Sequence, residues 1–436
     1  MIAEALFDVD HFTLRDGVMH CEGVSLDTIA AAVGTPVYIY STATLERHVN
    51  VFRDALADAE SVPERPLIAF AVKANPNAAV LATLARMGMG ADVVSGGELL
   101  RALAAGMRPG DIVFSGVGKT EAELRQGLDA GIGQFNVESE EELEMLSAVA
   151  VAMGRTARIA IRVNPDVEAG THAKISTGAA ANKFGIAHDR APDAYARAAE
   201  LPGIAVQGIA VHIGSQLTDL APLEAAFARV GALITTLREQ GHDIRTADLG
   251  GGLGVPYDPA KPAPPSPALY GAMVARATKG WGVRLIFEPG RLIVANAGVL
   301  LSRVIRVKRT AAADFVIVDA AMNDLLRPSL YDAWHDIVRV GGEAGRERVA
   351  YDVVGPVCET GDTFARQRDM PRCEAGDLVA ILGAGAYGAS MASTYNSRPL
   401  AAEVLVEDGR YALIRKRQDF DAMIADERPA NEWRSA

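Results

Sequence analysis

A lysine, a glutamate and a run of glycines stand where buried apolar stretches of this sequence end. Lys73 follows LIAFAV in the segment AVKANPN, Gly250–Gly252 follow IRTADL, and Glu288 follows VRLIF. A lysine amine can form an imine with an aldehyde, and the backbone N–H groups of glycines can approach an anion closely. A buried carboxylate needs a cationic partner or a raised pKa. Taken singly, each pattern also has a purely structural explanation, since glycine runs are often turns and strand-end lysines are often solvated.

His212 and Ser215 stand at the end of another apolar stretch, in VHIGSQ, and Arg291 lies three residues after Glu288. Alone, His212 is most simply explained as a hydrogen-bonded core residue, and Arg291 as the partner of Glu288. Together with Lys73 and the glycines, these residues meet the requirements of pyridoxal phosphate. That cofactor needs an amine for its aldehyde, a cradle for its phosphate, an acid for its ring nitrogen and a flat side chain against its ring.

Eight apolar stretches of strand character alternate with helical segments between residues 67 and 287. They are Leu67–Val72, Ala91–Val94, Asp111–Phe114, Gly133–Val137, Ala157–Val163, Val206–Ile213, Ile244–Leu249 and Val283–Phe287. Such alternation predicts a parallel sheet, and eight strands close a (β/α)8 TIM-type barrel, although an open doubly wound sheet also fits the pattern. In a barrel the residues after each strand gather at one end, where active sites lie. In the fourth helical segment, Ser139 and Glu142 resemble a capping box, and the run Glu140–Glu142 predicts a solvated face.

The sequence changes character after Arg291. Stretches such as VLLSRVIRVKR and DFVIVDAA have period-two or continuous β character, with Gly and Asp turns between them, which predicts an all-β domain. Two short strand-like pieces around Asp16-Gly17 are expected to return and join that domain. The prediction is an α/β chain with N-terminal strands in residues 1–36, a cofactor-binding barrel in residues 37–292, and a sandwich-like or barrel-like β domain in residues 293–436.

Composition limits the functions of this chain. Of its 436 residues, 49% are hydrophobic and 22% charged, which excludes disorder as the dominant state. A net charge of −12 and a pI near 5.3 give no electrostatic reason to bind nucleic acid or an anionic membrane. The first residues lack the features of a signal peptide, and Cys21, Cys358 and Cys373 form neither a disulfide framework nor a metal-binding spacing. We therefore expect a cytoplasmic protein without a metal, in which Cys21 and Cys373 are packing residues.

Nearly the whole chain, from about residue 9 to residue 420, resembles the diaminopimelate decarboxylases, whose pyridoxal phosphate fold is shared with alanine racemase and eukaryotic-type ornithine decarboxylase. The resemblance rests on AVKAN (71–75), NPDVEAGTHAKISTGAAANKFGI (164–186), HIGSQ (212–216), GGGLG (250–254), EPGR (288–291), RPSLYDAWH (327–335), GPVCETGD (355–362) and GAGAYGASMASTYNSRP (383–399). The combination of ISTG…KFG with CETGD is the specific part, because related decarboxylases usually differ there.

The resemblance implies roles around the cofactor. Lys73 would hold pyridoxal phosphate covalently, His212 would stack on its ring, and Glu288 would face the ring nitrogen. The other cofactor-binding residues would be Ser215, Gly251, Gly252, Pro289, Gly290, Arg291 and Tyr387, of which Ser215 and the first two glycines would bind the phosphate.

The resemblance also implies how the substrate is bound. The residues that would contact it are Arg291, Arg327, Tyr331, Glu359 and Tyr387. The two arginines and Tyr331 would hold the carboxylate at the end that does not react. Cys358 would donate a proton after carbon dioxide leaves, reaching in from the neighbouring subunit of a homodimer.

The implied reaction is the decarboxylation of meso-2,6-diaminopimelate at its D centre to L-lysine and carbon dioxide, the last step of bacterial lysine biosynthesis. Two alternatives remain open. One is a decarboxylase of ornithine, arginine, D-lysine or carboxyspermidine, although many such relatives have Asp where Glu359 stands. The other is a racemase or a cofactor-binding protein without catalysis, although a racemase of this fold usually relies on a tyrosine in the role that Cys358 has here.

Overall fold

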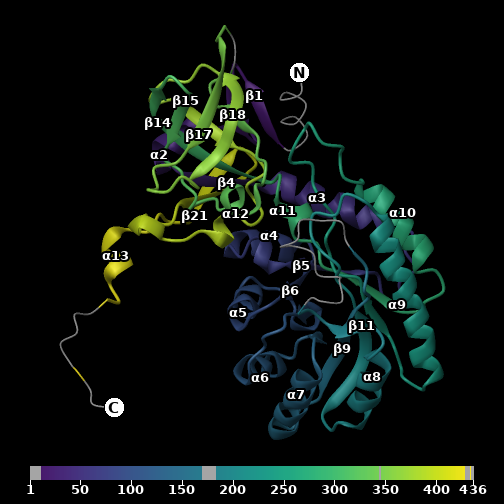
Figure 1. Cartoon of the computed structure of the whole chain (residues 1–436). Helices are drawn as coiled ribbons and strands as arrows, with labels where there is room; N and C mark the ends of the chain where they lie inside the picture. Colours follow the sequence, from purple (N-terminus) through teal and green to yellow (C-terminus); the bar gives the residue numbers. More distant parts are fainter. Residues whose placement is uncertain (1–10, 169–182, 343–344, 428–432, 434–436) are drawn as a thin grey trace. The chain divides into compact units, whose positions relative to one another are not determined.

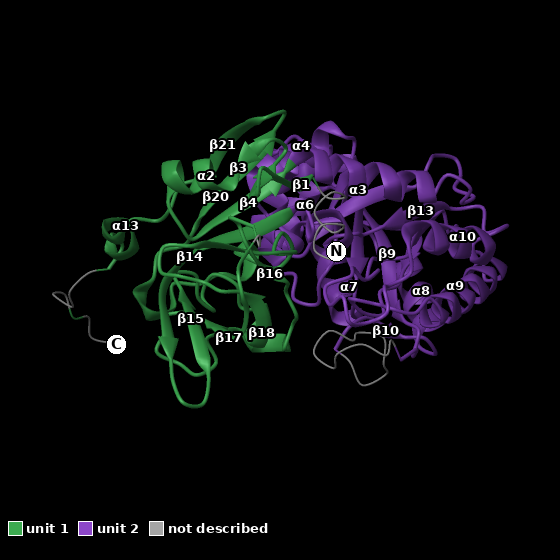
Figure 2. Ribbon diagram, turned by 90° about the horizontal axis from the view of Figure 1, so that it is seen from above, with its two compact units in different colours: residues 1–41, 298–436 green, residues 42–297 purple. Residues whose placement is uncertain are grey.

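The structure is a computed structural model that describes residues 11–168, 183–342, 345–427 and 433 (Figure 1). The chain divides into two compact units (Figure 2): unit 1 comprises Met1–Ser41 and Gly298–Ala436, and unit 2 comprises Thr42–Ala297. The domain boundaries expected from the sequence, after residues 36 and 292, lie a few residues before the boundaries in the structure, after Ser41 and Ala297.

Unit 2 contains a closed barrel of eight parallel strands, counted over its described residues. Around the ring they are β5 (Leu67–Ala71), β6 (Gly90–Val93), β7 (Ile112–Phe114), β8 (Gln134–Val137), β9 (Ala157–Asn164), β11 (Ile204–Ala210), β12 (Thr246–Asp248) and β13 (Arg284–Phe287). The ring closes because β13 pairs with β5, and a short strand, β10 (Ile186–Ala187), pairs with β9 outside it. Each ring strand coincides with one of the eight expected stretches, so the barrel is confirmed and the open sheet is excluded.

Helices separate the barrel strands and cover the outside of the barrel (Figure 1). They are α3 (Thr42–Ala55), α4 (Ala78–Arg86), α5 (Gly96–Ala104), α6 (Glu121–Ala130), α7 (Glu140–Met153), α8 (Ala191–Glu200), α9 (Ala221–Glu239), α10 (Pro267–Ala277) and the short α11 (Arg291–Val294). Two single turns of 3-10 helix are η1 (Val72–Ala74), directly after β5, and η2 (Pro109–Asp111), before β7. Several helices begin at a side chain that accepts an N–H bond from the first turn, as Asn77 does for α4 and Ser95 for α5.

The first turn of α7 differs from its sequence prediction. Ser139 accepts a hydrogen bond from the Glu142 N–H, which is one half of a capping box. The Glu142 side chain instead accepts hydrogen bonds from Lys119 Nζ at 2.7 Å and from the Glu138 N–H at 3.1 Å. Because Glu142 is buried, the prediction of a solvated face over Glu140–Glu142 is wrong at this residue.

Every residue of β5, β6, β7 and β8 is buried. Parallel barrel strands are covered by helices outside and by one another's side chains inside, which explains their nearly continuous apolar runs. The carboxyl ends of the eight strands meet at one end of the barrel, so the residues that follow each strand can form a common site.

Unit 1 is built mainly of β-strands, as the sequence predicts. Along its large sheet the order is β18 (Thr363–Pro371), β17 (Arg348–Val354), β15 (Asp314–Val318), β14 (Gly298–Arg309), β4 (Val37–Ser41), β20 (Ala402–Glu407) and β21 (Arg410–Arg415). Beside this path, β19 (Leu378–Ile381) pairs with β14, and β16 (Ile337–Arg339) pairs with β19. The expected barrel domain began at residue 37, but β4 pairs with β14 and β20 and so belongs to this sheet.

The N-terminal strands belong to unit 1, as expected, but form a three-stranded sheet of their own. These strands are β1 (Phe12–Arg15), β2 (Val18–Cys21) and β3 (Val24–Ser25), followed by α2 (Leu26–Val33). The Met19 N–H donates to the Val340 carbonyl at 2.9 Å, and Met19 packs in one core with Leu301 and Val404 of the large sheet. The two sheets therefore share one hydrophobic core.

Short helical turns complete unit 1. They are α12 (Arg327–Tyr331), η4 (Ala389–Met391), η5 (Tyr395–Ser397) and α13 (Phe420–Ile424). Over the part of the chain that the structure describes, we find no helix with the length and apolar character needed to cross a bilayer.

Candidate active site

Lys73 lies just beyond the carboxyl end of β5, in η1. Its Nζ donates a hydrogen bond to Asp92 Oδ2 at 2.7 Å, and Asp92, in β6, is fully buried. The other oxygen of Asp92, Oδ1, is buried and has no hydrogen-bond partner among the described residues. A buried acceptor without a donor is unfavourable, so Asp92 both holds the Lys73 amine and can accept a further donor.

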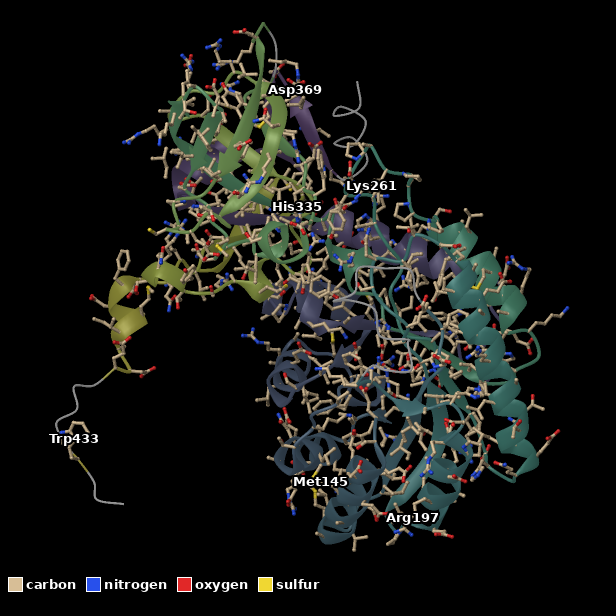
Figure 3. All side chains as sticks on the ribbon, in the orientation of Figure 1. Met145, Arg197, Lys261, His335, Asp369 and Trp433 are labelled. Carbon is tan, nitrogen blue, oxygen red and sulfur yellow. The ribbon has the colours of Figure 1, made fainter. Side chains whose placement is uncertain are left out.

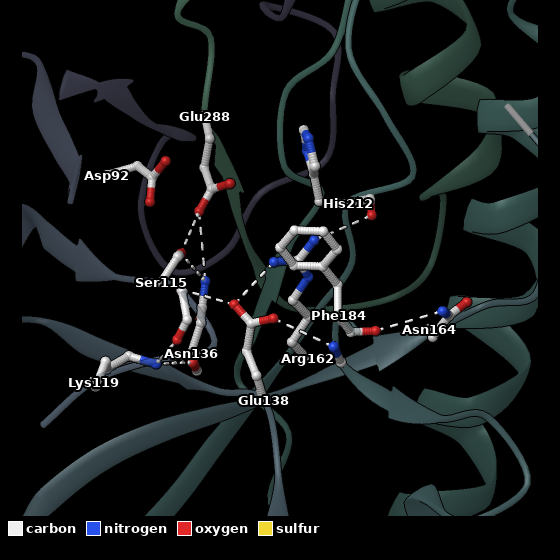
Figure 4. A network of polar contacts seen from close by, with 12 residues as sticks. Asp92, Ser115, Lys119, Asn136, Glu138, Arg162, Asn164, Phe184, His212 and Glu288 are labelled. Atoms are coloured by element: carbon white, nitrogen blue, oxygen red, sulfur yellow. Dashed lines mark hydrogen bonds and ion pairs between the residues drawn. The ribbon is translucent and has the colours of Figure 1, made fainter. Parts of the chain in front are cut away.

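Glu288, at the end of β13, points toward Ser115 and Asn136 (Figure 4). Ser115 Oγ donates to Glu288 Oε1 at 3.2 Å, and Asn136 Nδ2 bridges Glu288 Oε1 at 3.5 Å and Asp248 Oδ2 at 2.9 Å. Burial raises the pKa of Glu288 well above its usual range, and the negative charges of Asp248 and Asp92 add to that effect. Burial also raises the pKa of Asp248 to about 6. The surroundings of Glu288 thus agree with the second of the two sequence-based explanations, a raised pKa.

His212 follows β11, and its ring is fixed by the backbone. The Gly251 N–H donates to His212 Nδ1 at 3.2 Å, so the proton of the neutral ring is on Nε2. Burial lowers the pKa of His212 well below its usual value, and the nearby charges of Arg162 and Lys73 lower it further. The ring is therefore neutral at physiological pH.

The glycines after β12 occupy positions with no room for a side chain. A Cβ atom on Gly251 would clash with the Glu288 carbonyl oxygen, and one on Gly252, whose φ is +107°, would clash with the Gly214 carbonyl oxygen. Only glycine therefore allows the backbone after β12 to approach its neighbours so closely.

Arg291 begins α11 and is buried beside these loops. Its Nη2 donates to Ser215 Oγ at 3.1 Å, and its Nη1 donates to the Tyr257 hydroxyl at 3.0 Å. Arg291 therefore adds a positive charge next to Ser215, which was predicted to bind phosphate.

The EPGR segment packs directly against the segment that carries Lys73. The Ala71 N–H donates to the Pro289 carbonyl at 3.2 Å, and a Cβ on Gly290 would lie 3.0 Å from the Ala74 Cβ. The predicted residues Pro289 and Gly290 thus border the lysine through the backbone.

A further polar network in the barrel was not predicted from the sequence (Figure 4). Arg162 Nη1 donates to Glu138 Oε1 at 2.9 Å, and its guanidinium lies 5.0 Å from the centre of the Phe184 ring. Lys119 Nζ donates to the Asn136 carbonyl at 2.9 Å. Arg162 and Asn136 lie near the carboxyl ends of β9 and β8, Glu138 directly follows β8, and Lys119 lies in the loop after β7. Applying to these strands the principle that barrel sites form at strand ends would have identified these four residues, but not Phe184.

In unit 1, the RPSLY segment forms α12 and contacts the loop that carries Cys358. Ser329 Oγ donates to the Gly361 carbonyl at 2.6 Å. Arg327, at the start of α12, is buried, and its Nη1 lies 2.7 Å from His335 Nε2. Two of the predicted substrate-binding segments are thus joined within one unit.

Asp362 shapes the Cys358 loop, a role that the sequence did not reveal. Its Oδ2 accepts from the Val357 N–H and its Oδ1 from the Met322 N–H, both at 2.7 Å. Cys358 itself is an exposed free thiol.

The three remaining predicted site residues of unit 1 are Glu359, Tyr331 and Tyr387. Glu359 is exposed, and its Oε2 accepts from the Tyr395 hydroxyl at 3.1 Å. Tyr331 ends α12 and is half-buried. Tyr387 has a φ of +55°, a left-handed conformation that is uncommon for an aromatic residue and is typical of functional segments.

The predicted residues therefore form two groups, one in each unit. Unit 2 holds Lys73, His212, Ser215, Gly251, Gly252, Glu288, Pro289, Gly290 and Arg291, and unit 1 holds Arg327, Tyr331, Cys358, Glu359 and Tyr387. The ISTG part of the segment 164–186 lies outside the described residues.

Comparison with known protein families agrees with the geometry of unit 2. The family described as "Pyridoxal-dependent decarboxylase, pyridoxal binding domain" matches residues 42–295, nearly the whole of this unit. Unit 2 therefore contains the pyridoxal-binding domain of a pyridoxal-dependent decarboxylase.

Full-length relatives narrow this class. The chain is 56% identical to a diaminopimelate decarboxylase of Zymomonas mobilis, over 97% of this chain and 99% of that protein. Diaminopimelate decarboxylase from Helicobacter pylori, complexed with L-lysine, is 40% identical with a TM-score of 0.87, covering 92% of this chain and 98% of that one. The enzyme from M. jannaschii, in co-complex with L-lysine, is 36% identical with a TM-score of 0.91, covering 96% and 98%. The chain belongs to the diaminopimelate decarboxylase family.

The cofactor of this family is pyridoxal phosphate, and the residues of unit 2 fit it. The positions of Gly251 and Gly252 have no room for a Cβ, and backbone without side chains can approach a phosphate closely. Arg291 and Ser215 add a cation and a hydroxyl. The neutral ring of His212 can stack on an aromatic system, and Asp92 has an acceptor oxygen available.

Proposed function

We propose that the protein decarboxylates meso-2,6-diaminopimelate at its D centre and releases L-lysine, the last step of bacterial lysine biosynthesis. The observation that carries this proposal is the hydrogen bond from Ser329 to the Gly361 carbonyl. It joins the helix that begins with Arg327 to the loop of Cys358 and Glu359. A guanidinium and a carboxylate on adjoining segments suit an amino acid group, and diaminopimelate, unlike ornithine or arginine, has a second such group at its non-reacting end. The L-lysine bound to two relatives supports this choice, since L-lysine keeps that group.

In this proposal the residues of unit 2 hold the cofactor. When bound, pyridoxal phosphate withdraws electrons from the substrate α-carbon, so that the bond to the carboxylate can break. Lys73 holds the cofactor through the amine that donates to Asp92. Ser215 and Gly251–Gly252 bind the phosphate, and the hydrogen bond from Arg291 to Ser215 supports a phosphate role for Arg291 beside the substrate role that the resemblance implies.

Glu288 faces the ring nitrogen, and His212 stacks on the ring. Burial and the neighbouring acids raise the pKa of Glu288, and a positively charged ring nitrogen would add a cation beside it. His212 is held neutral and in one tautomer, so it presents a fixed aromatic face.

The substrate is held at both ends, because the bond that breaks must stand perpendicular to the cofactor ring. Arg327 and Tyr331 bind the carboxylate at the L end. Glu359 meets the substrate amino group or the distal end, and Tyr387 contacts both substrate and cofactor.

Cys358 donates the proton that takes the place of carbon dioxide. A thiol can serve as such a general acid. The exposure of Cys358 on unit 1 supports this role, because the thiol is accessible to a substrate.

A direct assay tests the proposed reaction. Purified protein loaded with pyridoxal phosphate is given each stereoisomer of diaminopimelate and, in parallel, ornithine, arginine, D-lysine and carboxyspermidine. We expect carbon dioxide and L-lysine in equal amounts from the meso isomer alone. Faster release from one of the other amino acids, or interconversion of enantiomers without gas, would contradict the proposal.

We also propose that the protein is a cytoplasmic homodimer in which Cys358 of one subunit serves Lys73 of the other. The three free cysteines support a reducing compartment. Mixing equal amounts of the inactive Lys73→Ala and Cys358→Ala proteins would form hybrid dimers in which one of the two sites is intact. Random exchange makes about half of the dimers hybrids, so about a quarter of wild-type activity should return. Activity no higher than that of the unmixed variants, after exchange has been verified, would exclude a shared site.

A further inference from the structure

Arg327 is held by a histidine that neither the sequence nor the resemblance had assigned a role. His335 (labelled in Figure 3) is almost completely buried, and its Nε2 lies 2.7 Å from Arg327 Nη1. Its other ring nitrogen, Nδ1, lies 2.8 Å from the Leu382 carbonyl oxygen. The imidazole therefore bridges the guanidinium and a backbone carbonyl.

The two contacts specify which ring nitrogen of His335 carries the proton. The Leu382 carbonyl can only accept, so Nδ1 carries the proton and donates it. The Arg327 guanidinium can only donate, so Nε2 must be the acceptor and carries no proton. A doubly protonated ring would place an N–H group against the guanidinium, so this arrangement requires a neutral imidazole.

The position of His335 is fixed by the register of two strands. His335 lies two residues before β16, and Leu382 is the first residue after β19, with which β16 pairs in the register Ile337 to Ile381. The Leu382 N–H donates to the Asp336 carbonyl at 2.8 Å and so continues the pairing toward the histidine. From the other side, Arg368 Nη1 donates to the His335 carbonyl at 2.9 Å.

A neutral partner suits an arginine that must bind a carboxylate. An ionised acid in the place of His335 would neutralise the guanidinium and compete with the carboxylate of the substrate. The imidazole instead fixes Nη1 of Arg327 while leaving the positive charge uncompensated by this contact. A guanidinium has five N–H donors, and a carboxylate needs only two of them.

We propose that His335 is a positioning residue that orients the Arg327 guanidinium toward the distal carboxylate of the substrate and thereby selects substrates that carry this group. The proposal rests on the proposed function, in which Arg327 binds that carboxylate.

Two substitutions separate the contacts of His335. In His335→Gln, the amide oxygen can occupy the place of Nε2 and accept from Arg327, but the bond to Leu382 is lost. In His335→Asn, the shorter amide can donate to Leu382 from the place of Nδ1, but the acceptor for Arg327 is lost. If His335 has only a structural role, the asparagine variant, which keeps the bond to Leu382, should behave more like wild type. If His335 positions Arg327, the glutamine variant, which keeps the acceptor for Arg327, should behave more like wild type.

The measurement is calorimetric binding of two probes to the holoenzyme variants. L-lysine keeps the distal carboxylate, and cadaverine (1,5-diaminopentane) lacks it. We expect His335→Asn to bind L-lysine about 10- to 100-fold more weakly, as for a lost hydrogen bond to a charged group, and His335→Gln to stay within about threefold of wild type. Cadaverine affinity should be unchanged in both variants.

His48 in α3 provides a matched control. Its Nε2 lies 3.0 Å from Arg47 Nη2 and its Nδ1 lies 2.9 Å from the Ile293 carbonyl, the same arrangement in unit 2. His48→Asn should leave L-lysine affinity unchanged. Equal loss of both probes in His335→Asn, or stronger L-lysine binding by His335→Asn than by His335→Gln, would overturn the proposal. Failure of the proposed function would be distinguishable, because the wild-type holoenzyme would then not bind L-lysine.

Discussion

Replacement of Asp248 by asparagine tests the electrostatics of the barrel site. Asp248 is 1% exposed, its Oδ2 accepts from Asn136 and its Oδ1 accepts from the Gly250 N–H, both at 2.9 Å. Asparagine has nearly the same shape but cannot ionise. We therefore expect Asp248→Asn to change how the stability of the protein depends on pH.

The size of the effect follows from the pKa of Asp248, which burial raises to about 6 in the folded protein. In the unfolded chain an aspartate has a pKa of about 3.9. The stabilising contribution of a group with a raised folded pKa is complete below about pH 4 and is lost as the pH rises through about 6. A shift of about two units corresponds to about 3 kcal/mol, of which about 1.4 kcal/mol falls between pH 5 and pH 7.5. Asparagine has no such loss, so the free energy of unfolding of Asp248→Asn, relative to wild type, should rise by that amount over this range.

Denaturant unfolding of the cofactor-free proteins between pH 5 and pH 7.5 measures this difference. Both oxygens of Asp248 accept hydrogen bonds, and an amide can replace only one of them, so the variant also loses about 1–3 kcal/mol at every pH. The slope with pH, and not the stability at one pH, is therefore the test. The exposed Asp129→Asn variant is the control and should keep the wild-type slope. Parallel curves for Asp248→Asn and wild type would refute the reasoning.

Three further substitutions test other parts of the account. Gly251→Ala places a Cβ against the Glu288 carbonyl. We therefore expect at least tenfold weaker binding of pyridoxal phosphate in a spectroscopic titration and a loss of about 1–3 kcal/mol in stability. Gly110→Ala, with open space around its Cβ, is the control and should behave as wild type. Cys358→Ala should keep the cofactor but lower kcat by about 10²–10⁴-fold, as for a lost general acid. Substitution of the buried cysteine, Cys373→Ala, is the control and should leave kcat unchanged. A wild-type kcat in Cys358→Ala would show that this thiol is not the proton donor. Ser329→Ala removes the bond that joins α12 to the Cys358 loop, and KM for diaminopimelate should rise several-fold without a change in cofactor affinity; an unchanged KM would show that this bond does not shape the substrate site.

The barrel could be predicted because its strands are buried on both faces. The five residues of β5 and the three of β7 are all apolar and buried, and such continuous apolar runs are visible in a sequence. For the same reason the first domain boundary was misplaced. All five residues of β4 are buried too, and nothing in VYIYS indicates whether that strand pairs in a barrel or in the sheet of unit 1.

The candidate site could be expected from the sequence where chemically complementary residues stand at the ends of predicted strands. Lys73, Glu288 and the glycine run each stand at a strand end, and their chemistry is complementary. Asn136 and Ser115 were missed because each lies in or directly after a short strand, and the sequence does not tell which side chains point into the cluster around Glu288.

Glu142 shows a second limit of sequence analysis. Three consecutive glutamates are typical of a solvated helix face, but the third is buried against Lys119, which stands 23 positions earlier in the chain. Such a pair depends on the packing of α7 against the barrel and cannot be recognised from local composition.

The claim that Lys73 carries the cofactor can be tested directly by chemical trapping. Borohydride reduction of the holoenzyme, followed by digestion and mass spectrometry, should place the pyridoxyl phosphate mass on the peptide that contains Lys73, and the Lys73→Ala protein should carry none there. Lys119 is the informative comparison, because it is a buried lysine of the same barrel. Modification of Lys119 or any other lysine, with Lys73 unmodified in a fully active preparation, would contradict the account.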